Sequence, residues 1–143
     1  MCLRVKDPTK IKKTGKERVF YKILAVVEGK DDFLVTPYMG QGESLGGTNY
    51  TYQDGFDFVE RRDWFEVTRG GFHLFKNLKD AENEARWMND HFIFYKGHIR
   101  EGCVSEYRVY KAIVPKGTTY IEGTFHVFSY PSVVVKEVRY EEI

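Results

Sequence analysis

The chain has 143 residues, of which 42% are hydrophobic and 16% aromatic, and its formal net charge is +1. This composition excludes a disordered polypeptide, which would be poor in aromatic residues, and the length suits one domain with its own core. There is no membrane-length apolar run and no signal peptide, and Cys2 and Cys103 are too few for a disulfide framework. We therefore expect a cytoplasmic protein with free thiols and no membrane contact.

The first 17 residues are predicted to form a basic arm, and residues 18–143 to form a single folded domain. Residues 1–22 contain eight Lys or Arg against two acids, whereas residues 28–66 contain nine acids against three Lys or Arg. A basic arm can bind phosphate or nucleic acid, lie against the acidic middle of the same chain, or remain solvated. Nucleic acid is disfavoured as a partner because no basic-aromatic motif of a known module follows the arm.

The first half of the predicted domain reads as short strands. Residues 18–28 are nearly continuous in apolar side chains and residues 33–39 return after a Gly/Asp turn, which predicts a β-hairpin. Four glycines in residues 40–49 predict a loop between strands, because no helix pattern follows them. Residues 50–67 alternate aromatic and charged side chains, and this predicts one or two short strands.

One helix is predicted at about residues 77–91. It follows a short aromatic strand at residues 72–75, and Asn77 is a favourable N-cap with Asp80 in the first turn. Its expected buried face has helical spacing and consists of Leu78, Ala81, Ala85 and Met88.

The last third of the chain is predicted to be β-structure again. A turn at residues 115–117 has Pro and Gly at suitable positions. The predicted strands are residues 92–95, 106–114, 118–123, 124–129 and 133–141. Together these elements predict an α+β fold, in which one main helix packs on a strongly bent antiparallel sheet or half-barrel.

The candidate ligand-binding residues combine rings and cations, since a planar base stacks on aromatic faces and a phosphate binds cations. His73 is included because it should point away from Phe72 and Leu74 on its strand. The set is Tyr21, Lys22, Arg69, Phe72, His73, Tyr107 and Lys116. Alternatively, these residues have structural roles only: the rings belong to the core, His73 is a hydrogen-bonded or exposed strand residue, and the cations are solvated. The four histidines lack zinc spacing and no catalytic set is apparent, so we predict no metal, cofactor or catalytic residues.

Two segments resemble small uncharacterised proteins of bacteriophages and prophages. They are GFHLFKNLKDAENEARW and YKAIVPKGTTYIEG…SYPSVVVKEVRYEEI, and they cover about half of the chain. The resemblance implies a phage or mobile-element origin and an accessory, anti-defence role in the host cell.

The chain also resembles the ADP-ribosyltransferase fold, more distantly. In that fold a strand bearing Arg or His opens the NAD site, and late strands carry a catalytic Glu. Tyr21 and Lys22 stand where the Arg or His would be, and Glu122 and Glu137 are the candidate glutamates. The chain has neither a Ser-Thr-Ser strand nor a Glu-x-Glu turn.

Three functional hypotheses follow. The first is a non-enzymatic phage accessory protein that binds a host protein or sequesters a nucleotide-type signalling ligand. The second is a divergent NAD-dependent transferase, and the third is a nucleic-acid binder that uses the basic arm. An exposed aromatic strand edge would favour a homo-oligomer.

Overall fold

The computed structural model describes residues 3–29, 33–36, 42–45, 49–91, 104–125 and 129–143. The elements in chain order are β1 (Leu3–Val5), β2 (Lys12–Lys13), β3 (Arg18–Val27), β4 (Phe33–Val35), β5 (Gly42–Ser44), β6 (Tyr50–Thr51), β7 (Asp57–Glu60), β8 (Phe65–Arg69), β9 (Phe72–Phe75), α1 (Leu78–His91), β10 (Val104–Val114), β11 (Thr119–Phe125), β12 (Tyr130–Val135) and β13 (Glu137–Glu141). The predictions for Cys2, Cys103 and the strand at residues 92–95 lie outside the described residues.

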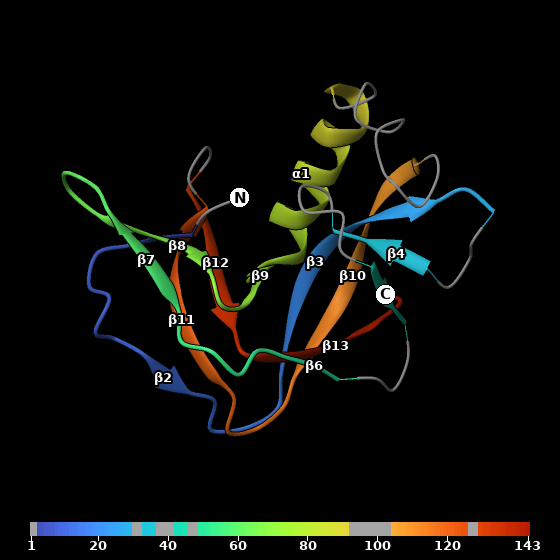
Figure 1. Ribbon diagram of the computed structural model, residues 1–143. Helices are drawn as coiled ribbons and strands as arrows, with labels where there is room; N and C mark the ends of the chain where they lie inside the picture. Colours follow the sequence, from blue (N-terminus) through green and yellow to red (C-terminus); the bar gives the residue numbers. More distant parts are fainter. Residues whose placement is uncertain (1–2, 30–32, 37–41, 46–48, 92–103, 126–128) are drawn as a thin grey trace.

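The strands form a curled antiparallel half-barrel that carries α1 (Figure 1). Their order is β6-β13-β10-β3-β9-β12-β11-β1-β8-β7, with β2 on β11, β4 on β3 and β5 on β4. This confirms the predicted bent sheet with a helix, although the chain is more strongly β than the α+β prediction implies.

Strand β3 lies inside the sheet and has buried apolar side chains on both faces. Phe20 and Leu24 are buried in one core cluster, while Ile23 and Ala25 are buried in another. Along one edge β3 pairs with β10, and the other edge is shared by β9 and β4. The antiparallel pairing of β3 with β4 confirms the predicted hairpin.

Helix α1 begins directly after Asn77, as predicted. The carbonyl of Asn77 accepts the Ala81 N–H at 3.2 Å, and its side-chain amide donates to Asp80 at 3.1 Å. The buried face packs on β10 and β3 and consists of Ala81, Glu84, Ala85 and Met88. Glu84 was not expected there, and Leu78, which was, is only partly buried.

The side chain of Asn89 fastens the end of α1 to β10. Its amide nitrogen donates to the Tyr107 carbonyl at 2.9 Å, and its amide oxygen accepts the Tyr107 N–H at 2.8 Å. The two bonds lie beside an irregularity in the β3–β10 pairing between Val104 and Glu106. For this one residue of β10, the Asn89 side chain therefore makes the two backbone hydrogen bonds that a neighbouring strand would otherwise make.

We expect Asn89→Ala to lower the free energy of unfolding by about 2 kcal/mol, because it leaves a partly buried N–H and C=O without their partners. Urea denaturation measures the difference. Asn83→Ala on the same helix is the matched control, since Asn83 is only partly buried and the same change in helix propensity applies. Equal stability of the two variants would contradict this role for Asn89.

The predicted break between residues 123 and 124 is wrong. Strand β11 runs without interruption from Thr119 to Phe125 and pairs with β12 along this length. Gly123 is not a turn residue; it lies where the backbone of Arg4 comes closest to β11.

The predicted single strand at residues 133–141 is divided at Lys136. The Lys136 N–H donates to the Thr119 carbonyl at 3.0 Å, and its side chain donates to the carbonyls of Asp54 and Gly70. The Lys136 ammonium also lies 4.2 Å from the centre of the Phe56 ring. Burial of this ammonium group lowers the pKa of Lys136 from the ordinary lysine value. These contacts fix the corner where the chain passes from β12 to β13.

The segment predicted as a basic arm contributes two strands. β1 lies between β11 and β8, with Leu3 and Val5 almost completely buried, and β2 pairs with β11. Thr14 is also buried, and its hydroxyl donates to the Pro115 carbonyl at 2.7 Å. Much of the basic segment is therefore held against the late strands of the chain.

Candidate functional site

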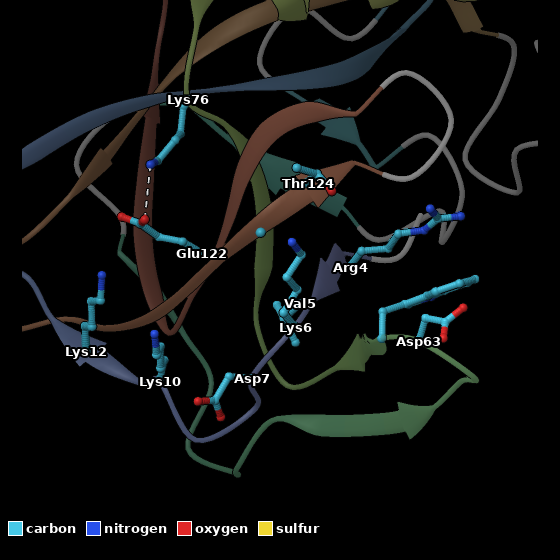
Figure 2. A pocket seen from close by; sticks show the side chains of 12 residues that line it. Arg4, Val5, Lys6, Asp7, Lys10, Lys12, Asp63, Lys76, Glu122 and Thr124 are labelled. Atoms are coloured by element: carbon cyan, nitrogen blue, oxygen red, sulfur yellow. Dashed lines mark ion pairs between the residues drawn. The ribbon is translucent and has the colours of Figure 1, made fainter.

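A groove of about 550 Å³ opens beside β1 and β11 (Figure 2). Its lining comes from β1 and the loop after it, β2, the turn before β8, the connection between β9 and α1, and β11. The residues are Arg4, Val5, Lys6, Asp7, Lys10, Lys12, Asp63, Trp64, Lys76, Glu122, Gly123 and Thr124. This volume is within the range of about 300–1,000 Å³ that is usual for small-molecule sites.

The alternation of β1 directs its cationic side chain to the groove. Leu3 and Val5 are buried in a core cluster with residues of β8, β11 and β12. Arg4 is paired with Thr124 of β11, and directly opposed residues project from the same face of a sheet. Arg4 is also paired with Glu66 of β8, so its backbone is held from both sides.

The loop after β1 is stabilised by Asp7. A carboxylate oxygen of Asp7 accepts the Thr9 hydroxyl at 2.5 Å and the Thr9 N–H at 2.9 Å. The hydroxyl bond, followed by the N–H bond, lowers the pKa of Asp7. The Lys10 N–H also donates to the Asp7 carbonyl at 3.3 Å. This turn brings Lys10 back to the groove.

The lining is cationic on balance. The described residues of the lining include five cations and three carboxylates, which together give a net charge of +2. Lys76 and Glu122 neutralise each other in an ion pair of 3.3 Å. Lys6, Lys10 and Lys12 are exposed, and none of them forms an ion pair with another described residue. Three ammonium groups thus remain available to an anion.

Arg4 is held by an aromatic ring. Its guanidinium carbon lies 4.3 Å from the centre of the Trp64 ring, a cation–π contact. Glu66, which is opposite Arg4 in the sheet, forms its ion pair with Arg61 at 3.1 Å. Within the described part of the chain Arg4 has no ion pair of its own.

Two predicted site residues, Phe72 and Tyr107, lie in the core. Phe72 is 7% exposed and packs on Tyr52 with 4.8 Å between ring centres, whereas Tyr107 is 3% exposed in a second cluster. Burial raises the pKa of Tyr107. Tyr21 is partly buried and packs against that second cluster.

Lys22 and His73 are in direct contact. The Lys22 ammonium donates to the His73 carbonyl at 3.2 Å. Burial, reinforced by the charge of Lys22, lowers the pKa of His73 to about 3. The imidazole is therefore neutral at physiological pH.

Arg69 and Lys116 are exposed, at the end of β8 and in the turn between β10 and β11. None of the seven predicted residues lines the groove. Their contact with a ligand stays a prediction.

The sequence places Lys6, Lys10 and Lys12 in the predicted basic arm but does not indicate the groove. The alternation of Leu3, Arg4, Val5 and Lys6 is a strand pattern that could have indicated an ordered segment. Nothing in the sequence indicates that Trp64 lies beside this segment, because the contact depends on the pairing of β1 with β8.

The described residues contain no cluster of three or more His, Cys, Asp or Glu placed to hold a metal ion, and His98 and His126 lie outside them. No described helix has the length and apolar character needed to cross a membrane. Comparisons with protein-family models, with curated proteins and with solved structures found no match for this chain.

Proposed function

We propose that this protein is a non-enzymatic phage or prophage accessory protein that binds a nucleotide-type anion in the groove beside β1 and β11. The observation that carries the proposal is that cations from four separate segments line one cavity, and that four of these five cations form no ion pair among the described residues. Cations gathered around a concave site raise the local concentration of an anionic ligand.

Cations outnumber aromatic side chains in the described lining, and this favours phosphate contacts over base stacking. Among the described residues, Trp64 is the one aromatic side chain that lines the groove, and Arg4 already covers a face of its ring. A ligand with phosphates therefore gains more from this site than a neutral planar molecule does. The resemblance to prophage proteins supports the remaining part of the proposal, sequestration of a signalling ligand in the host cytoplasm.

We expect the triple variant K6E/K10E/K12E to bind a nucleotide such as ADP-ribose at least about tenfold more weakly than the wild type, because each reversal turns attraction into repulsion. Isothermal titration calorimetry at low salt measures the difference. The control K16E/K79E/R86E changes the net charge equally at exposed positions outside the groove lining. An equal loss in both variants would mean that net charge, and not the groove, governs binding.

Charge reversal also tests the nucleic-acid hypothesis without removing part of the sheet. Deletion of residues 1–16 would remove β1 and β2, and Leu3 and Val5 with them. A DNA or RNA oligomer that binds more tightly than ADP-ribose, with affinity falling steeply in salt, would favour a polymer ligand.

One observation favours the transferase alternative: Glu122 lies in the groove. Its carboxylate is in an ion pair with Lys76, while Glu137 lies on β13, which pairs with β6 at the other end of the sheet order. Incubation with labelled NAD and host lysate distinguishes the two functions. Label transfer that is lost in Glu122→Gln would replace the binding proposal with an enzymatic one.

A further inference from the structure

We infer that Arg4, oriented by Trp64, is the phosphate anchor of the groove, and that the ligand is a nucleotide-type molecule with about two negative charges. This inference rests on the proposed function and extends it by naming the residue that binds the phosphate.

The backbone of Arg4 is fixed before any ligand arrives. β1 is an interior strand at this position, with Arg4 paired to Thr124 on one side and to Glu66 on the other. The approach of β11 is so close that a Cβ on Gly123 would lie 2.0 Å from the Arg4 carbonyl oxygen. We therefore expect the Arg4 Cα to stay in place when a ligand binds.

The side chain is oriented as well. The guanidinium lies over Trp64 at 4.3 Å, and its Nε is buried without a hydrogen-bond partner. Because Nε is covered, the terminal Nη1 and Nη2 groups are the ones left to contact a ligand. Two coplanar N–H groups match two oxygens of a phosphate, a geometry that lysine cannot reproduce. Ordering by the ring also reduces the entropy lost on binding.

The remaining charges set the class of ligand. Lys6, Lys10 and Lys12 act as mobile point charges, whereas Asp7 and Asp63 oppose excess negative charge, so that the lining carries +2 overall. A phosphate monoester carries about 1.5–2 negative charges near neutral pH and balances this value. The cavity of about 550 Å³ has room for a nucleoside attached to that phosphate.

The test is calorimetric titration of the full chain with AMP, ADP-ribose and adenosine. We expect AMP and ADP-ribose to bind and adenosine to bind at least about tenfold more weakly. Arg4→Lys keeps the charge but loses the paired donors, so the affinity for AMP should fall about tenfold, while Arg108→Lys on β10 should leave it unchanged. Thermal unfolding of each variant verifies that it is folded.

A double-mutant cycle isolates the role of Trp64 as a positioning residue. Trp64→Leu should weaken AMP binding when Arg4 is present and have little effect in the Arg4→Ala background. A merely structural Trp64 would weaken binding equally in both backgrounds, and this outcome would overturn its positioning role.

The inference and the proposed function fail in different ways. If Arg4→Lys binds AMP as the wild type does while K6E/K10E/K12E does not bind, the anchor is wrong and the groove proposal stands. If adenosine binds as tightly as AMP, the phosphate assignment is wrong. If none of these ligands binds to the wild type at millimolar concentration, both the Arg4 anchor and the proposed anion site in the groove are wrong.

Discussion

Protonation of His73 should destabilise the protein as the pH falls below about 6.5, the ordinary histidine pKa. Burial lowers the pKa of His73 to about 3 in the folded protein. Between these two values the unfolded chain binds a proton at this histidine and the folded protein does not, so stability is lost with falling pH. Within this window each pH unit lowers the free energy of unfolding by about 1.4 kcal/mol. The loss between about pH 7 and pH 4.5 should therefore be about 2–3 kcal/mol.

Urea denaturation of wild type and His73→Gln between about pH 7 and pH 4.5 measures this effect, since glutamine cannot be protonated in the range. The pH dependence of the variant should be shallower than that of the wild type. Asn83→Gln on α1, which changes no titratable group, is the control and should keep the wild-type slope. A His73→Gln variant with the wild-type slope would contradict the buried neutral imidazole.

Glu84 should act with the opposite sign and must be separated from His73. Its side chain is 3% exposed, one carboxylate oxygen has no hydrogen-bond partner, and burial raises its pKa. The folded protein therefore holds this proton to higher pH than the unfolded chain does, and stability falls as the pH rises through that window. Because the two groups oppose each other, the difference between each variant and the wild type is the quantity to compare.

Gly123→Ala should lower the free energy of unfolding by about 3 kcal/mol, at the upper end for overpacking. The added Cβ would lie 2.0 Å from the Arg4 carbonyl oxygen and 3.0 Å from Leu3 Cγ. Since the obstacle is mainly backbone, β1 must separate from β11 to accept it. The pairing that places Arg4 in the groove would be lost with that separation.

The same substitution at Gly15 is the control, because a Cβ there meets nothing within 4 Å. Thermal and urea unfolding of both variants, followed by calorimetry with ADP-ribose, measure stability and binding. We expect Gly15→Ala to remain within about 0.5 kcal/mol of the wild type. If Gly123→Ala were equally stable, β1 could not be packed as closely on β11 as described.

The elements with strong local signals could be predicted from the sequence. The apolar run of β3, the hairpin to β4 and the start of α1 at Asn77 each depend on neighbouring residues. The sequence predicts a strand boundary after Gly123, because the close contact that requires a glycine there is with Arg4 of β1, far away in the chain. The interruption at Lys136 is equally hidden from the sequence, since its partners Asp54 and Gly70 are distant in the chain.

The candidate site was less predictable than the fold. Composition draws attention to cations and rings, but it cannot tell which rings are interior. Phe72 and Tyr107 are core residues, whereas Trp64 is at the groove. Glu84 has helical spacing with the buried residues Ala81 and Met88, and a hydropathy pattern assigns such a carboxylate to solvent by default.

The pairing of β1 with β11 has a consequence for biosynthesis. β1 is synthesised before its neighbour β11, which extends to Phe125. Until then Leu3 and Val5 lack part of their apolar cover, and such non-local pairing is slow to form. The groove should therefore form only once β11 has been synthesised, and ligand capture should begin only after translation has passed β11.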